Sequence, residues 1–304
     1  RLLRGGLVRL YGPGFRIRGA VESSAFASAK LLIQVSPPLL ALGLRFFIAG
    51  VVMVGYGMVV GSYRPVGWKG WGQLTVLGLL NQAGYQGLAW VAMGLGLVSS
   101  AITAVIISMN PIVIALLAVP FLGERMSARR IAGLLLGMVG VVIVLNSRVN
   151  VTGEDPFGLM LIGVALLSMS AGSILYKRWN LDMPLSVSVG GQFLTAGVAI
   201  FIVGLFTEDP SEIIWGAQYA IVMVYIVLGA TVGGIGLWFY LLSHGSASDA
   251  SALHFLMPPF GLMYGWVLLG EPVAMGDLIG IIPIGLGIWL ATHRRRSLSD
   301  EKEA

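Results

Sequence analysis

Long hydrophobic runs separated by short polar breaks dominate the pattern of this sequence. A helix that crosses a bilayer needs about 20 mostly apolar residues. Runs of this kind predict membrane helices at residues 38–60, 70–94, 99–121, 128–146, 157–177, 184–206, 217–243, 248–269 and 277–293. No segment between them is long enough for a soluble domain, so the expected fold class is an all-α polytopic membrane protein.

A constant offset of 147 residues relates the first half of the chain to the second. Prolines, tryptophans, lysines and glutamates carry more weight in this comparison than leucines and glycines, because the sequence is so apolar. The pairs are Pro37 and Pro184, Lys30 and Lys177, Phe46 and Phe193, Trp68 and Trp215, Pro111 and Pro258, and Glu124 and Glu271, each glutamate closing a Leu-Gly-Glu triplet. An unbroken register of this length indicates a duplicated unit.

The duplication predicts one more helix in front of the others. Residues 23–30 match the end of the helix that begins near Phe157, so a first helix is expected over residues 10–33. Arg18 and Glu22 fall inside this segment and would each cost several kcal/mol in lipid. We therefore expect these two side chains to face protein or a water-filled cavity.

Five helices in each copy turn the second copy upside down, so Glu124 and Glu271 are expected on opposite faces of the membrane. The predicted architecture is ten transmembrane helices built from two inverted five-helix repeats. Its expected segments are an N-terminal cytoplasmic segment at residues 1–10, the first repeat at 11–147, the second repeat at 157–294 and a cytoplasmic tail at 295–304. In secondary transporters, such a pair encloses a site near the middle of the membrane that opens to each side in turn.

The charged residues are few and gather at helix ends. Only 11% of residues are charged, while the net charge is +5. A basic chain can indicate a nucleic-acid partner, but alternate loops carry the Lys and Arg residues, and the loops between them are acidic. Basic residues collect on the cytoplasmic side of membrane proteins, which predicts cytoplasmic N- and C-termini and no nucleic-acid partner. The chain has no cysteine, so it offers neither a disulfide nor a thiolate metal site, and no metal or cofactor is expected.

Pro37-Pro38 opens the helix that carries Leu44-Arg45-Phe46, and a mid-run proline and a Leu-Gly-Glu exit follow in both copies. This combination resembles the EamA family of the drug/metabolite transporter superfamily, from about Ser23 to the end of the chain. The resemblance implies a ten-helix carrier in the bacterial inner membrane that exports small metabolites through a central cavity. Within the family the chain looks most like the YddG-type exporters of aromatic amino acids. It departs from the family before Ser23, where an ordinary apolar helix is the rule.

The third predicted helix carries a polar stripe of Asn81, Gln82, Tyr85 and Gln86. Polar groups are costly in lipid, so the stripe is expected to face the interior, either to line a substrate site or to join helices by hydrogen bonds. Trp90 follows on the same face, as an interfacial anchor or as a stacking wall for a substrate.

Two prolines and one histidine are further candidates. Pro111 and Pro258 each remove a backbone hydrogen bond, and we expect them to kink their helices toward the site, as hinges or as simple bends. His254 lies well inside a predicted span, where an ionisable group indicates function, although a packing histidine is the alternative.

The remaining substrate-binding candidates are Arg45, Trp238, Tyr240, Ser170 and Ser173. Arg45 could attract a substrate carboxylate or could extend to the membrane surface, and the residue at its repeat position is the neutral Gln192. Trp238 and Tyr240 offer aromatic surface, and the two serines offer hydroxyl groups.

The sequence therefore predicts a secondary transporter, not an enzyme, that exports amino acids including aromatic ones by alternating access. One alternative is an antiporter of anionic metabolites such as sugar phosphates or nucleotide sugars, which would need several cationic side chains in mid-cavity. A second alternative is a membrane scaffold that transports nothing. The expected partners are the lipid bilayer and a small-molecule substrate.

Overall fold

The structure is a computed structural model, and it describes residues 31–98, 103, 106–146, 155–256 and 275–292. These residues form helices and short connections, without strands among them. The helices of the first half are α3 (Pro38–Val59), α4 (Trp68–Gly78), the π-helix η1 (Leu79–Gly87), α5 (Leu88–Gly94), α7 (Asn110–Leu122) and α8 (Ala128–Asn146). Those of the second half are α9 (Pro156–Trp179), α10 (Leu185–Thr207), the short η2 (Pro210–Glu212), α11 (Ala217–Tyr225), the π-helix η3 (Ile226–Ile235), α12 (Gly236–His244), α13 (Ala247–Ala252), the 3-10 helix η4 (Leu253–Leu256) and α15 (Met275–Thr292).

The predicted helices at 38–60, 128–146, 157–177, 184–206 and 277–293 are confirmed to within two residues at each described end. The predicted helices at 70–94 and 217–243 are also confirmed, and each changes to π-helix in the middle. The predicted first helix lies outside the described residues except for residues 31–33, which are helical and followed by a turn at Gln34.

The fourth predicted helix is interrupted by a turn, and the ninth changes from α-helix to 3-10 helix within its described part. The chain is helical at residues 106–108, turns at Met109 and enters α7 at Asn110, with Pro111 in the first turn. Proline fits the first turn of a helix because no hydrogen bond is lost there. The ninth run begins as the short α13 and continues as η4, while the rest of it, with Pro258, lies outside the described residues.

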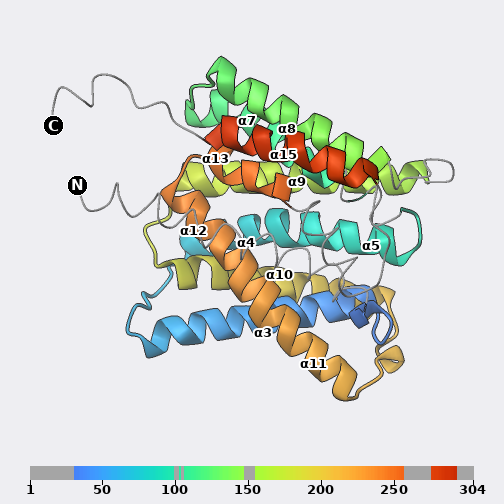
Figure 1. The fold of residues 1–304 in the computed structure, drawn as a ribbon. Coiled ribbons are helices and arrows are strands. Elements are labelled where there is room, and N and C mark those ends of the chain that lie inside the picture. The colour runs from blue at the N-terminus through green and yellow to red at the C-terminus, as the bar shows by residue number, and fades with distance from the viewer. Residues whose placement is uncertain (1–30, 99–102, 104–105, 147–154, 257–274, 293–304) are drawn as a thin grey trace.

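Helices α3 and α10 pack extensively on each other and lie side by side in Figure 1. Glycines make this approach possible, because a Cβ added at Gly50 would lie 2.8 Å from the carbonyl oxygen of Gly190, and one added at Gly197 would lie 3.0 Å from that of Gly43. The residue numbers rise along one helix and fall along the other, so the two helices are antiparallel. The two contacts exchange into one another when each residue is shifted by 147 positions.

Helices α8 and α15 form a second antiparallel pair in the same way, in the upper part of Figure 1. A Cβ at Gly140 would lie 2.6 Å from the carbonyl oxygen of Gly280, and one at Gly133 would lie 2.7 Å from that of Gly287. Equivalent helices of the two copies therefore pack against each other twice, each time through small residues that allow close contact of backbones.

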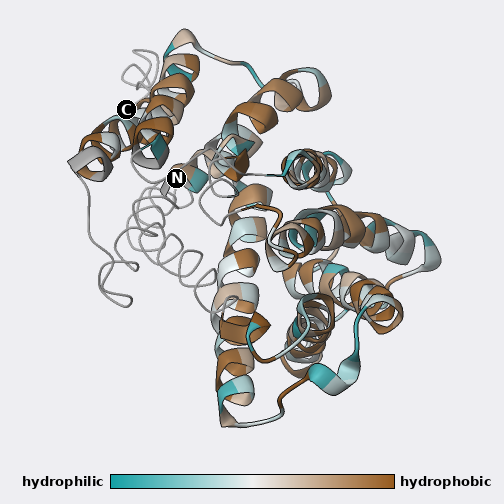
Figure 2. Ribbon diagram, turned by 90° about the vertical axis from the view of Figure 1, so that its right-hand side faces the viewer, coloured by the Kyte–Doolittle hydropathy of each residue, from teal (hydrophilic) through white to brown (hydrophobic). Residues whose placement is uncertain are grey.

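The outer surface is apolar over most of the length of the helices, and Figure 2 shows hydrophilic residues mainly near helix ends and in the connections. Val59, Phe206, Leu116 and Ile221 are among the large side chains that remain mostly exposed. Within the part of the chain that the structure describes, four helices are long and apolar enough to cross a membrane, namely Pro38–Val59, Pro156–Trp179, Leu185–Thr207 and Ala217–His244. Ile106–Leu122 and Leu278–Ala291 are shorter apolar helices. Exposed apolar area of this extent is expected where lipid is the solvent.

Two glutamates tie helices together at opposite ends of the molecule. Glu208 follows α10, and its carboxylate accepts hydrogen bonds of 2.8 Å each from the backbone N–H groups of Leu39 and Leu40 in the first turn of α3. Glu124 accepts from the backbone N–H of Ala247 at 2.7 Å and from the hydroxyl of Ser248 at 2.7 Å. Each carboxylate satisfies backbone donors that the start of a helix leaves without partners.

Candidate functional site

A belt of buried polar side chains crosses the middle of the helix assembly, where α3 and α10 meet the two π-helices. Its members, which we call the central site, are Arg45 from α3, Gln192 from α10, Asn81 and Gln82 from η1 and Thr231 from η3. All five are 6% exposed or less. The otherwise apolar interior of the helix assembly therefore contains polar side chains, and buried polar groups need hydrogen-bond partners.

Arg45 is 3% exposed, so it does not extend to the membrane surface. Its Nε donates a hydrogen bond of 2.6 Å to the hydroxyl of Thr231, and this is the one hydrogen bond of its guanidinium to the described residues. The guanidinium carbon lies 5.1 Å from the ring centre of Phe46 and 5.8 Å from that of Trp90. No carboxylate of the described residues pairs with Arg45. Aromatic faces attract a cation but replace an anion only in part.

Trp90 is 5% exposed. It lies in α5, beside the buried guanidinium rather than at an outer end of the helices. This position does not match the interfacial anchor, which needs a ring in contact with the headgroup region. The role of Trp90 as a stacking wall for a substrate stays a prediction.

Gln192 occupies in the second copy the position that Arg45 occupies in the first. Its Oε1 accepts a hydrogen bond of 3.3 Å from Nδ2 of Asn81, and its own NH2 group donates to the carbonyl of Ser188 at 3.0 Å. Arg45 reaches η3 of the second copy, and Gln192 is bonded to η1 of the first copy. The two equivalent positions therefore each form a hydrogen bond to the π-helix of the other copy, one through a guanidinium and the other through an amide.

The predicted polar stripe lies entirely in the π-helix η1. Such segments have wider turns than an α-helix and occur often at functional sites. Asn81 Oδ1 and Gln82 Oε1 are buried and have no hydrogen-bond partner in the described part of the chain. Tyr85 and Gln86 are half-buried. The stripe thus faces the interior, as predicted, and leaves two acceptor atoms for another group.

His254 and Trp238 lie next to each other, with ring centres 4.7 Å apart and planes at 81°. Both are buried, and Nδ1 of His254 lies 3.1 Å from the carbonyl of Ser251. Tyr240 does not join them. It lies two residues further along α12, on another face, and its ring packs on His244 at 4.2 Å near the end of the helix.

The two serines of α9 are fully buried. Ser170 donates to Asn110 Oδ1 at 2.8 Å, and Ser173 donates to the carbonyl of Met169 at 2.8 Å. Gly172 packs against the side-chain amide of Asn81. Ser170 and Gly172 are two positions apart in an α-helix and so point to different sides of α9. Ser170 and Asn110 therefore form a second polar contact, separated from the central site by α9.

Sequence reasoning missed Thr231 and Asn110 as site residues, and it noted Gln192 only as the neutral partner of Arg45. The signal for Gln192 was present, because the repeat gives it the position that Arg45 has in the first copy. Thr231 is an isolated hydroxyl in a glycine-rich stretch, and only the packing of α3 on η3 reveals its role.

The sequence matches a known transporter family over most of its length. A profile of the EamA-like transporter family matches residues 18–146 and 156–292. The chain belongs to the EamA-like transporter family. Family membership makes it a multi-pass membrane transporter, with the lipid bilayer as its surroundings and a small molecule as its substrate.

Several relatives of this EamA-like transporter are similar over most of its length. The uncharacterized transporter YvbV of Bacillus subtilis is 26% identical over 271 residues, which cover 88% of this chain and 87% of that protein. The uncharacterized inner membrane transporter YedA of Escherichia coli is 24% identical over 295 residues, covering 94% and 91%. A WAT1-related chloroplastic protein of Arabidopsis thaliana is 25% identical over 276 residues, covering 88% of this chain and 66% of its own length.

The fold also resembles that of a solved protein. A protein crystal structure superposes with a TM-score of 0.76 at 23% sequence identity, over 92% of this chain and 94% of that one. At this identity the likeness concerns the fold alone.

Proposed function

We propose that this EamA-like transporter exports amino acids, aromatic ones included, across a bacterial inner membrane, and that Arg45 binds the carboxylate of the substrate. The observation that carries the proposal is a buried guanidinium that has one hydrogen bond, to Thr231, and no carboxylate partner among the described residues. A buried charge without a partner is strongly unfavourable. A substrate that brings the missing anion supplies its own binding energy.

The remaining groups of the central site suit the other parts of an amino acid. Asn81 Oδ1 and Gln82 Oε1 are free acceptors, which an ammonium group could use. Phe46 and Trp90 flank the guanidinium with aromatic surface, which suits an apolar side chain. In this proposal, the lining of the substrate site also includes Trp90, Tyr85, Gln86, Trp238 and His254. Three more proposed substrate-binding residues lie outside the central site, namely Ser170, Ser173 and Tyr240.

The architecture that we propose is ten transmembrane helices in two inverted repeats, residues 11–147 and 157–294. The antiparallel pairs of α3 with α10 and of α8 with α15 support it, because their glycine contacts exchange under the offset of 147 residues. The two π-helices support it as well, since η1 begins at Leu79 and η3 begins at Ile226, again 147 positions apart. An internal symmetry of this kind accompanies alternating access in secondary transporters.

We also infer that the termini and the basic loops are cytoplasmic. Contacts between loops support a common side for the basic residues, since Arg64 lies 4.0 Å from Asp182, and Arg130 reaches Ser246 at 3.5 Å. We place the acidic connections on the opposite side of the membrane. Two connections of this side are joined by a hydrogen bond from the backbone N–H of Asp155 to the carbonyl of Leu97. Pro111 and Pro258 are the proposed hinges, and the helix break at Met109, beside Pro111, supports the first of them.

Arg45 also favours a second candidate, an antiporter of anionic metabolites. A dianionic phosphate calls for several cations, and Arg45 and His254 are the ionisable side chains of basic residues that are buried among the described residues. One guanidinium matches a single carboxylate better than a phosphate. A transport assay with both classes of substrate decides between the two candidates.

The test is counterflow into liposomes that contain the purified full chain. Labelled phenylalanine, leucine and a sugar phosphate are offered separately, with and without a pH gradient. We expect saturable uptake of the amino acids, with an apparent KM that rises in Arg45→Gln and is unchanged in Arg64→Gln, whose side chain is exposed. Uptake of the sugar phosphate alone would favour the antiporter. No uptake of any compound by folded protein would contradict the transport role.

A further inference from the structure

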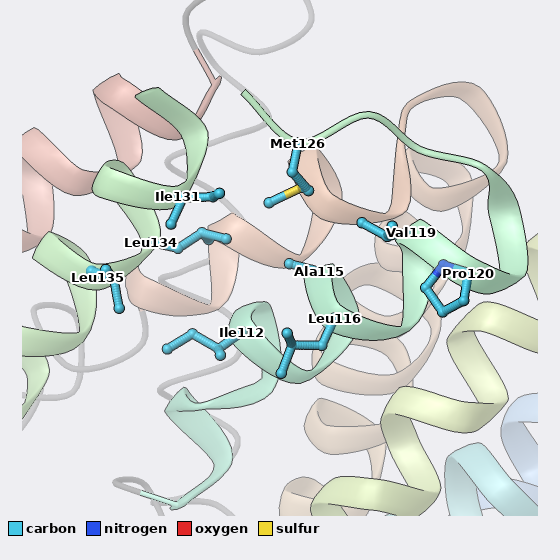
Figure 3. Close-up of a pocket in the computed structure, with 9 residues that line it drawn as sticks. All are labelled: Ile112, Ala115, Leu116, Val119, Pro120, Met126, Ile131, Leu134 and Leu135. Carbon is cyan, nitrogen blue, oxygen red and sulfur yellow. The ribbon is translucent and has the colours of Figure 1, made fainter. Parts of the chain in front are cut away.

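An apolar groove runs along the outside of the protein between α7 and α8 (Figure 3). Its volume is about 410 Å³, and every side chain that lines it is apolar. Leu116 and Val119 come from α7, Ile131 and Leu135 from α8, and Met126 from the connection between the two helices. The groove exists because α7 packs mainly on α9 and α13, whereas α8 packs mainly on α15, so the two neighbours in sequence separate.

The groove opens to the surroundings of the protein rather than to the central site. Leu116 is 69% exposed and Leu135 is 56% exposed. In a protein that lies in a bilayer, an exposed apolar groove on the helices contacts acyl chains. Any protein surface of this kind meets lipid, and a specific lipid site needs a further feature that recognises the headgroup.

Three arginines at one end of the groove provide that feature. Arg125 is exposed and precedes the lining residue Met126, and Arg129 and Arg130 precede the lining residue Ile131 in the first turn of α8. Neither Arg125 nor Arg129 forms a salt bridge with a described residue. The adjacent carboxylate of Glu124 is already engaged by α13.

Two of the arginines are held in place by their neighbours. The guanidinium carbon of Arg129 lies 4.8 Å from the ring centre of Trp289. Nη2 of Arg130 donates to the hydroxyl of Ser246 at 3.5 Å. Positive charge is therefore fixed where the groove meets the end of the helices, as it must be to hold a headgroup at the membrane surface.

We propose that this groove is a binding site for an anionic phospholipid, with one acyl chain between α7 and α8 and the phosphate headgroup at Arg125, Arg129 and Arg130. The charge of the arginine cluster selects the headgroup, and the apolar lining accepts the chain. A bound lipid would join α7 to α8 on the side where they lack direct packing. This site is separate from the central site and does not depend on which substrate is carried.

The experiment is native mass spectrometry of the purified full chain with an equimolar mixture of phosphatidylglycerol and phosphatidylcholine. We expect the wild type to retain phosphatidylglycerol preferentially. Each arginine near a surface contributes about 1 kcal/mol to binding of anionic lipid, which is about a fivefold change. The double variant Arg125→Gln/Arg129→Gln should therefore reduce the preference by about 25-fold. Arg64→Gln/Lys69→Gln, which removes two basic residues from another connection, is the matched control and should retain it.

A second pair of variants tests the acyl chain. Leu135→Trp fills the groove from its exposed edge and should lower retention of both lipids at unchanged melting temperature, whereas Val139→Trp, one turn further along α8 and also exposed, should not. If Arg125→Gln/Arg129→Gln and the control Arg64→Gln/Lys69→Gln lost the preference for phosphatidylglycerol equally, the effect would be general surface attraction. That result would overturn the proposed site. So would unchanged retention in Leu135→Trp. A wild-type dimer that Leu135→Trp dissociates would instead assign the groove to a second copy of the chain.

Discussion

Phe46 and Phe193 stack on each other with ring centres 5.5 Å apart and planes at 29°. They are the same position in the two halves of the chain, 147 residues apart. Two equivalent side chains can touch face to face only where the two halves approach a common axis. The neighbours of this pair in sequence are Arg45 and Gln192, so the axis passes through the central site.

The glycine contacts predict that α3 and α10 do not tolerate added methyl groups. A Cβ at Gly50 would lie 2.7 Å from the backbone nitrogen of Leu194. Because backbone atoms cannot move aside easily, we expect Gly50→Ala to lower the free energy of unfolding by about 1–3 kcal/mol, measured by thermal or denaturant unfolding in detergent.

Gly55 in the same helix is the control, since a Cβ there would meet nothing within 4 Å. Gly55→Ala should be neutral or should stabilise by up to about 1 kcal/mol through helix propensity. Equal stability of the two variants would contradict the close packing of α3 on α10.

The glutamate of the first Leu-Gly-Glu triplet has a structural role that can be measured. Glu124 accepts hydrogen bonds from the start of α13 in the other half of the chain. We expect Glu124→Gln to lower the free energy of unfolding by about 1–2 kcal/mol, because one amide oxygen replaces two carboxylate acceptors. Glu212→Gln changes an exposed glutamate and should have no effect. A stable Glu124→Gln protein would show that the cap contributes little.

The central site predicts a separation between function and stability at Arg45. A neutral amide at the equivalent position is accommodated as Gln192, so Arg45→Gln should fold with an unchanged melting temperature. A charge-assisted hydrogen bond contributes about 1.5–3 kcal/mol, so the apparent KM for an amino acid should rise by about 10- to 100-fold in liposome uptake. Thr231→Val removes the acceptor of Arg45 and should give a smaller rise. Normal uptake by Arg45→Gln would exclude a role in substrate binding.

The contact between Gly172 and Asn81 can be tested with a double-mutant cycle. A Cβ at Gly172 would lie 2.7 Å from Cγ of Asn81. Gly172→Ala should therefore push the amide away from Gln192 and reduce both stability and uptake, whereas Gly172→Ala combined with Asn81→Ala should recover stability but not uptake. Additive losses of stability would mean that the two residues are not coupled.

The sequence predicts the extent of most helices because apolar runs, prolines and polar breaks mark their ends. α8 begins at Ala128, where its hydrophobic run begins. The π-helices are not predictable in this way, since a slightly wider turn leaves the same apolar composition. The sequence predicted a kink at Pro111. The structure instead has a turn at Met109, after which α7 begins, and this form depends on local packing.

The candidate site is only partly predictable for a similar reason. Burial of the stripe at Asn81 and Gln82 follows from the cost of polar groups in lipid. The bond from Arg45 to Thr231 joins residues 186 positions apart, and hydropathy contains no information about such a pair. Trp238 and Tyr240 were treated alike, although two positions along a helix separate their faces, and only Trp238 reaches His254.

The wide turns of η1 and η3 begin at corresponding places in the two copies. Two separate insertions would have had to occur at matching sites, so a single event before the gene was copied is the simpler history. On that account, the ancestral half-length protein already had this distortion in its third helix. If the two copies are inverted as proposed above, two such half-length chains would have to pair in opposite orientations to form the same central site.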